Sequence, residues 1–195
     1  MQRTSLTPNP MRRLQILFLL LISAILSACE RSPTASQRTG AAEIALTTAA
    51  GTVQLPRAQA GALVYSPGPT PDTRSYYLVF TAGDIANVGI EVEFSQNLPS
   101  NQDLPNPGTY IVGVSGPMRV AYGSSLLWRG GKFQQYVAYS GPSSLTIETA
   151  TPERITGRFT IEETHEYTKE RVTVSGTFSA DQVVEFADLP RLVGH

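Results

Sequence analysis

The sequence has few residues of the types that cross-link chains or bind metals. It contains one cysteine, Cys29, and two histidines among 195 residues. A single cysteine excludes an intramolecular disulfide, so the fold must be stabilised by burial of apolar side chains and by backbone hydrogen bonds. Basic residues are not in excess either, since 15 lysines and arginines stand against 16 acidic residues. Nucleic-acid-binding domains present a clustered basic face, so we expect no nucleic-acid partner.

Helical periodicity is missing from residue 41 onward. No stretch there spaces apolar residues by three and four over three turns. Valine, isoleucine, tyrosine, phenylalanine and threonine instead form short runs between glycine, proline and asparagine. In Val88–Ser95 the apolar side chains alternate with Glu91 and Glu93. This pattern predicts a strand with one buried face and one wet face.

The whole of residues 41–195 reads as one all-β domain. About ten short strands with tight links favour a single antiparallel β-sandwich or β-barrel. The strands that we predict are residues 43–47, 52–55, 62–66, 75–81, 88–95, 109–114, 135–139, 144–149, 154–162, 170–179 and 183–186.

Two segments near the carboxyl terminus share one pattern. Residues 155–160 (Ile-Thr-Gly-Arg-Phe-Thr) recur nineteen residues later as residues 174–179 (Val-Ser-Gly-Thr-Phe-Ser). In strand geometry the apolar residue, the glycine and the phenylalanine of each copy project to one face. We therefore predict an antiparallel hairpin whose strands are joined by a polar loop, residues 163–169.

The amino terminus has the three parts of a secretory signal. Arg12 and Arg13 precede thirteen residues, 14–26, that are apolar except for Gln15 and Ser23. Small residues, Ser27 and Ala28, follow. This order predicts a signal peptide over residues 1–28, with translation beginning at Met1 or at Met11. A retained transmembrane helix would need about 20 apolar residues, so we do not favour it.

The segment Leu26-Ser27-Ala28-Cys29 resembles the lipobox of bacterial lipoproteins. The resemblance implies cleavage before Cys29, a diacylglycerol on its thiol, and a further fatty acyl chain, such as palmitate, on its new amine. Two or three chains anchor a protein durably where one would not. Because Glu30 is not the aspartate that favours inner-membrane retention in enteric bacteria, we expect the outer membrane. The protein would then face the periplasm or the cell surface.

Cleavage before residue 29 would change the balance of charge. It removes three arginines and leaves 167 residues with 12 basic and 16 acidic side chains, a formal charge of −4. Residues 29–40 are mostly polar and include arginine, serine, proline, threonine, glutamine and one glycine, with almost nothing to bury. We interpret them as the lipidated end and a flexible tether.

Residues 60–180 resemble uncharacterised small β-rich bacterial envelope lipoproteins. The resemblance is carried by short segments, which are residues 77–80 (Tyr-Leu-Val-Phe), 108–110 (Gly-Thr-Tyr), 140–147, and the two Gly-x-Phe copies. It implies a β-rich envelope domain, and the group has no established activity to transfer to this chain.

No motif in the domain indicates catalysis, a cofactor or a metal. His165 is predicted in a charged loop and His195 is the last residue, so with Cys29 lipidated the chain lacks the three or four ligands of a zinc site. We therefore expect a non-catalytic module that binds or assembles with a partner. That partner would be another envelope protein or a glycan, with the membrane reached through the lipid anchor.

Aromatic and cationic residues suggest where binding occurs. We predict an exposed glycine-rich loop around Gly130 and Gly131 that could stack on sugar rings, peptide or lipid head groups. The candidate binding residues are Trp128, Arg129, Lys132 and Phe133, supported by Tyr122 and Tyr136.

Two alternatives stay open. A small envelope hydrolase acting on glycan or peptide would need Asp84, Glu91, Glu93 or His165 to converge in a pocket. A lipocalin-like carrier would need a closed barrel around an apolar cavity of several hundred cubic ångströms.

Overall fold

The computed structural model describes residues 40–65, 70–113, 120–137, 142–165, 167–183 and 185–192. The signal peptide, Cys29, residues 29–39 of the tether and His195 lie outside these ranges. The described residues form eleven strands and one short 3-10 helix. None of the helices in these ranges has the length and apolar character needed to cross a membrane.

The strands account for most of the domain. Their bounds are β1 Gly40–Thr48, β2 Gly51–Leu55, β3 Gln59–Tyr65, β4 Thr73–Gly83, β5 Val88–Pro99, β6 Gly108–Val112, β7 Val120–Arg129, β8 Lys132–Val137, β9 Ser144–Ala150, β10 Arg154–His165 and β11 Arg171–Gln182, and the 3-10 helix η1 is Phe186–Asp188.

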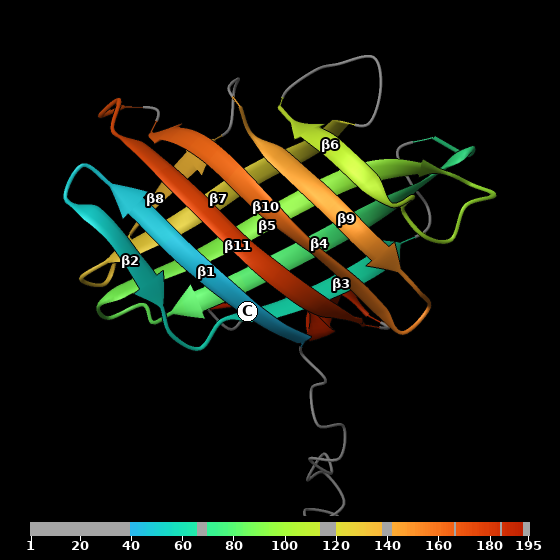
Figure 1. Cartoon of the computed structure of the whole chain (residues 1–195), viewed down its shortest axis with the longest axis horizontal. Coiled ribbons are helices and arrows are strands. Elements are labelled where there is room, and N and C mark those ends of the chain that lie inside the picture. Colours follow the sequence, from blue (N-terminus) through green and yellow to red (C-terminus); the bar gives the residue numbers. More distant parts are fainter. Residues whose placement is uncertain are drawn as a thin grey trace, which may run out of the picture. The chain divides into compact units, whose positions relative to one another are not determined.

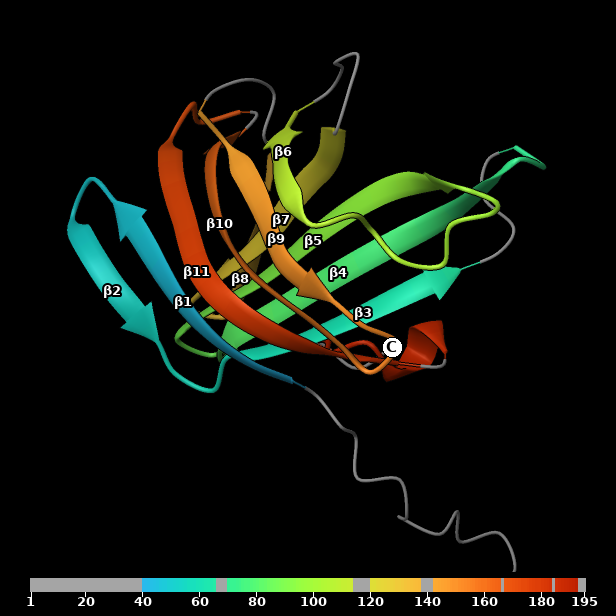
Figure 2. The same ribbon diagram turned by 45° about the vertical axis from the view of Figure 1, so that its right-hand side comes forward.

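All eleven strands belong to one sheet (Figure 1), so the all-β prediction is confirmed. The order is β2-β1-β11-β3-β4-β5-β7-β6-β9-β10-β8, with further pairings β1–β3, β11–β10 and β7–β8. Among the described pairings only β11–β3 and β6–β7 are parallel. In Figures 1 and 2 the strands β1, β11, β10 and β9 cross in front of β3, β4, β5 and β7.

The core lies between these two parts of the sheet. The ring of Phe80 on β4 stacks on Phe159 of β10, with centroids 4.8 Å apart. Phe178 lies 4.9 Å and Phe94 5.8 Å from the same ring. Burial of four phenylalanines in mutual contact contributes strongly to stability, because each ring removes a large apolar area from water.

The repeated Gly-x-Phe segments form the predicted hairpin, β10 with β11. In its register Gly157 faces Phe178, and Gly176 faces Phe159. An ideal Cβ at Gly157 would lie 2.9 Å from the Phe178 ring, and one at Gly176 would lie 3.1 Å from the Phe159 ring. Each phenylalanine thus occupies the space that its cross-strand glycine leaves open, which explains why the pattern occurs twice.

Strand β7 is an element that sequence reasoning missed. Its Gly123, flanked by serine, interrupts the alternation of apolar and polar residues. The glycine pairs with Phe94, and a Cβ there would lie 2.8 Å from Val112. Close packing of neighbouring side chains on Gly123 therefore holds the strand where local propensity is weak.

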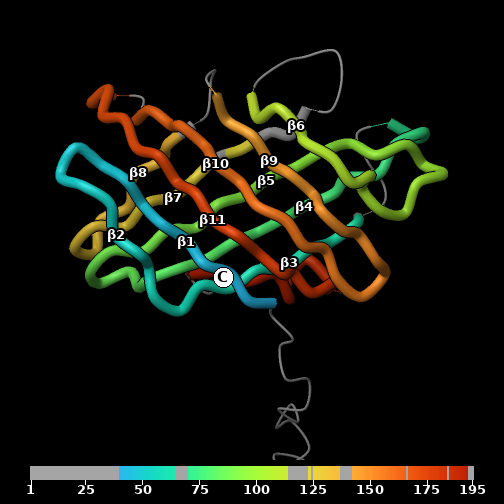
Figure 3. The backbone as a smooth tube through the Cα atoms, in the orientation of Figure 1, coloured from blue at the N-terminus to red at the C-terminus, as the bar shows by residue number. Residues whose placement is uncertain are grey.

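Strand β1 pairs with both of the strands that follow it in the chain. Strand β2 pairs with residues 44–48 of β1, whereas β3 pairs with β1 only at Gly40 and Ala41 and otherwise follows β4 (Figure 3). We expected Gly40 to end the tether, but it is buried and pairs with Ala60. A Cβ there would overlap the Ser179 carbonyl oxygen, so only glycine fits.

The carboxyl-terminal segment differs from prediction. Residues 183–186 are not a strand, because the chain turns into η1 after Val183 donates its N–H to the Ala62 carbonyl. Leu189 then packs with Leu63 and Val79 on the face of β3 and β4 opposite the main core. The segment buries apolar side chains on a face that alternation alone assigns to solvent.

The same segment binds the acidic side chains of β5. Nη1 of Arg191 lies 2.7 Å from Glu91 Oε1 and 3.4 Å from Glu93 Oε2. The side chain of Glu91 is only 12% exposed, and it also accepts the N–H of Leu192. The predicted wet face of β5 is therefore covered here, and its carboxylates hold the end of the chain.

Candidate functional site

The predicted exposed loop around Gly130 is a tight two-residue turn between β7 and β8. Gly130 and Gly131 have φ values of 56° and 76°, which are easily reached by glycine. Arg129 and Lys132 face each other across the turn. The exposed glycine-rich segment is therefore a two-residue turn and not a longer loop, because paired positive-φ glycines favour a hairpin with in-register strands.

The hairpin places the five candidate binding residues whose side chains are described on two different faces. Trp128 and Phe133 are cross-strand partners with ring centroids 6.5 Å apart. Trp128 is 8% exposed, whereas Phe133 is 67% exposed. Arg129 and Lys132 belong to the opposite face, because successive side chains of a strand alternate. Tyr122 lies in β7, but its side chain is outside the described part of the structure.

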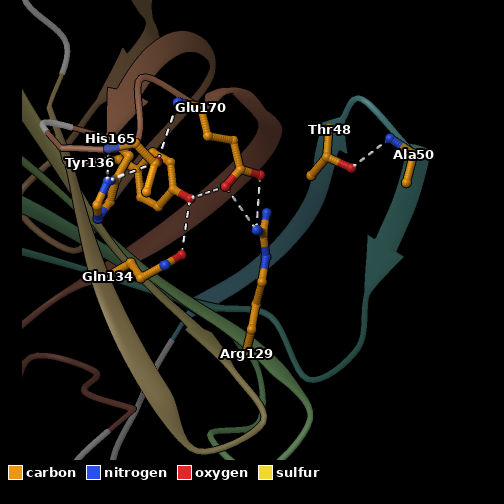
Figure 4. A network of polar contacts seen from close by, with 8 residues as sticks. Thr48, Ala50, Arg129, Gln134, Tyr136, His165 and Glu170 are labelled. Carbon is orange, nitrogen blue, oxygen red and sulfur yellow. Dashed lines mark hydrogen bonds and ion pairs between the residues drawn. The ribbon is translucent and has the colours of Figure 1, made fainter.

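Arg129 and Tyr136 meet in a polar cluster between the β7–β8 and β10–β11 hairpins (Figure 4). Nη1 of Arg129 donates to Glu170 Oε1 at 2.8 Å and to Oε2 at 3.1 Å. The Tyr136 hydroxyl lies 3.0 Å from Glu170 Oε2 and 3.2 Å from Gln134 Oε1, and shares its one hydrogen between them. The side chains of Arg129 and Glu170 are 36% and 32% exposed, so this pair is the solvent-facing side of the cluster.

His165 lies at the end of β10 beside the same tyrosine. Its ring meets Tyr136 edge-on with centroids 5.3 Å apart. Its Nδ1 accepts the N–H of Thr168 at 3.0 Å, which assigns the ring hydrogen of neutral His165 to Nε2. The prediction of a histidine in a loop is corrected, because β10 continues three residues beyond Glu162 before the chain turns.

The deepest members of the cluster are Glu163 and Ser125. Glu163 and Ser125 are each 1% exposed. Both carboxyl oxygens of Glu163 and the hydroxyl oxygen of Ser125 lack a hydrogen-bond partner. Burial raises the pKa of Glu163. The nearby Ser125 hydroxyl lowers it and so offsets part of that rise. An unpartnered buried carboxyl group is costly to the fold, so Glu163 is a candidate functional residue.

Burial and neighbouring charges shift three pKa values in the cluster. Desolvation raises the pKa of Glu163 to about 8. Desolvation and the hydrogen bond to Glu170 raise the pKa of Tyr136 to about 12. Partial desolvation raises the pKa of Glu170, but hydrogen bonds from Arg129 and Tyr136 outweigh it and leave a lowered value. At neutral pH the cluster thus holds one ion pair and one protonated carboxyl group.

The residues required for a hydrolase have separate partners. Glu91 and Glu93 bind Arg191, while Asp84 accepts from Asn87 at the β4–β5 turn. His165 belongs to the cluster on the β10–β11 hairpin. These contacts give no sign of the converging acid and base that glycan or peptide hydrolysis needs. Within the described ranges, no group of three or more His, Cys, Asp or Glu side chains could hold a metal ion.

Sequence reasoning identified part of this cluster only. Arg129 and Tyr136 were chosen as surface residues, whereas Glu163 was assigned to the polar loop and Glu170 to the start of the strand that follows it. One signal does mark Glu163, since it continues the alternation of Ile155, Gly157, Phe159 and Ile161 on the core face. An acidic residue in that phase predicts a buried carboxyl group.

Comparison with protein-family models, curated proteins and solved structures finds no match to this chain. Any functional conclusion therefore depends on the residues themselves.

Proposed function

We propose that this protein is a cell-envelope lipoprotein, anchored through acylated Cys29, whose β domain is a non-catalytic binding or assembly module. The observation that carries the proposal is the lipobox-like segment Leu26-Ser27-Ala28-Cys29 behind a basic and apolar leader. Two or three acyl chains would keep the module at a membrane, and the outer membrane is favoured because Glu30 replaces the retention aspartate. The anchor would raise the local concentration of other molecules held there.

The polar cluster supports a binding role for the domain. Buried oxygens without partners at Glu163 and Ser125 leave hydrogen-bonding capacity that the fold itself does not use. On the outer side of the same hairpin Phe133 offers an exposed ring, so it stays a candidate for contact with a glycan or an envelope protein.

We also propose that the sheet is a closed barrel and not a sandwich. The support is the circuit of hydrogen-bonded neighbours β3-β4-β5-β7-β8-β10-β11, which returns to β3 through the β11–β3 pairing. The phenylalanines around Phe80 fill the centre of this circuit. That packing favours an interior of side chains over the apolar cavity of a lipocalin-like carrier.

The test of anchoring compares wild-type protein with Cys29→Ser in membrane fractions. We expect wild type in the membrane pellet, extractable only by detergent, and the variant as an uncleaved precursor or in the soluble fraction. Ser27→Thr is a matched control for substitution near the cleavage site. Metabolic labelling with a fatty acid then reports acylation directly, and absence of label on the wild type would contradict the proposal.

A further inference from the structure

We propose that Glu163 and Ser125 form a binding site for the ammonium group of a small primary amine. The inference names a ligand class for the binding role proposed above, but it does not depend on acylation of Cys29. It stands on three buried side-chain oxygens without a hydrogen-bond partner, which belong to β7 and β10, the two strands that flank β8.

The two residues come from strands that the fold brings together. Ser125 lies on β7 directly across from Tyr136 of β8. Glu163 lies on β10, next to Thr164, which pairs with Val137 of β8. Both side chains are 1% exposed, so bulk water does not solvate the carboxyl group. An ionised carboxylate here requires a compensating donor.

The surrounding charged groups do not supply that donor. Arg129 is occupied by Glu170, which also receives the hydroxyl of Tyr136. His165 uses Nδ1 as an acceptor from Thr168. Among the described ion pairs none includes Glu163. The ion pair between Arg129 and Glu170 is therefore complete within the cluster. The carboxyl group of Glu163 is left for a positively charged ligand.

A primary ammonium group matches this arrangement in the number of its hydrogen-bond donors and in the sign of its charge. It has three N–H donors and no acceptor, as does a lysine side chain. The site has three oxygens that can accept, two on Glu163 and one on Ser125. The Tyr136 ring beside them adds an aromatic surface, which favours cations. Calcium prefers six to eight oxygen ligands, more than these two side chains provide.

Titration of the full-length protein, purified in detergent, with methylammonium chloride tests the site. Isothermal titration calorimetry at pH 7 should show saturable binding by wild type. We expect Glu163→Gln to weaken the affinity by about ten-fold or more, because a charge-assisted hydrogen bond is lost. Glu162→Gln is the matched control, since Glu162 is the exposed neighbour on the other face of β10, and it should bind as wild type does.

Two further measurements separate this site from non-specific cation binding. Tetramethylammonium has the charge but no N–H donor, so it should bind at least ten-fold more weakly than methylammonium. Binding should also release protons at pH 7, up to about one per site, since burial raises the pKa of Glu163 to about 8 and the amine binds the ionised carboxylate. The released protons are measured by repeating the calorimetry in buffers of different ionisation enthalpy.

Three results would overturn the inference. One is the absence of saturable methylammonium binding to wild type. Another is equal affinity in Glu163→Gln and Glu162→Gln. The third is equal binding of tetramethylammonium, which would show that the oxygens do not recognise N–H donors. Failure of anchoring in the Cys29→Ser comparison would leave all three readouts unaffected, so the two proposals fail separately.

Discussion

Substitution of Glu163 by glutamine should change how stability depends on pH. The carboxyl group has a pKa of about 8 in the folded protein and an ordinary value of 4.5 in the unfolded chain. Below pH 4.5 the carboxyl group is protonated in both the folded and the unfolded protein. The contribution of the raised pKa to the free energy of unfolding then has its full value. As the pH rises from 4.5 to 8 the unfolded state loses the proton first, so the free energy of unfolding decreases, and it levels off above pH 8.

The magnitude follows from the size of the shift. Each pKa unit corresponds to about 1.4 kcal/mol, so wild type should lose roughly 4–5 kcal/mol of stability across this interval. Glu163→Gln cannot ionise and should not show the decrease. The other shifted groups in the cluster act outside this interval, because the pKa of Tyr136 is raised to about 12 and the pKa of Glu170 is lowered below its ordinary value of 4.5.

Urea denaturation at pH 5, 7 and 9 measures the effect. With an unfolding slope of about 2 kcal/mol/M, the midpoint of wild type should move by roughly 2 M relative to that of Glu163→Gln. Glu162→Gln should follow wild type, because its side chain is exposed. Parallel curves for wild type and Glu163→Gln over the whole range would refute the reasoning that the carboxyl group is buried without a partner.

Three further predictions concern the fold. Phe80→Ala should lower the free energy of unfolding by about 3–5 kcal/mol in urea titrations, because it removes the ring that contacts three other phenylalanines; a loss below 1 kcal/mol would contradict the packing. Gly176→Val should destabilise by about 2 kcal/mol or more, since its Cβ would overlap the Glu43 carbonyl oxygen; an unchanged melting temperature would rule out this close approach. Arg191→Ala should increase amide hydrogen exchange in residues 186–192 while the core strands keep their protection, and unchanged exchange would show that Glu91 does not hold the segment.

Alternation of side chains predicted most of the fold because many strands bury only one face. Val88–Ser95 and the repeated Gly-x-Phe segments were found as strands for this reason. Strand β7 escaped prediction, because Gly123 is fixed by the Phe94 ring and by Val112, which lie on other strands. The carboxyl-terminal segment was misread as a strand, because its apolar residues bury against a sheet face that the local pattern assigns to solvent.

The candidate site depends on contacts that local sequence does not contain. Arg129 and Glu170 are separated by 41 positions, and they meet only because two hairpins lie beside each other. Aromatic and basic composition drew attention to Arg129 and Tyr136, but it could not show that Trp128 and Phe133 lie on the opposite face. Strand register decides which side chains share a face, and register arises from the whole sheet.

Intact-mass measurement of the protein extracted from membranes tests the central claim most directly. The account predicts a polypeptide that begins at Cys29 and is heavier than residues 29–195 by a glyceryl group with two or three fatty acyl chains. A chain that carries no acyl mass on Cys29, or that begins at any other residue, would contradict it.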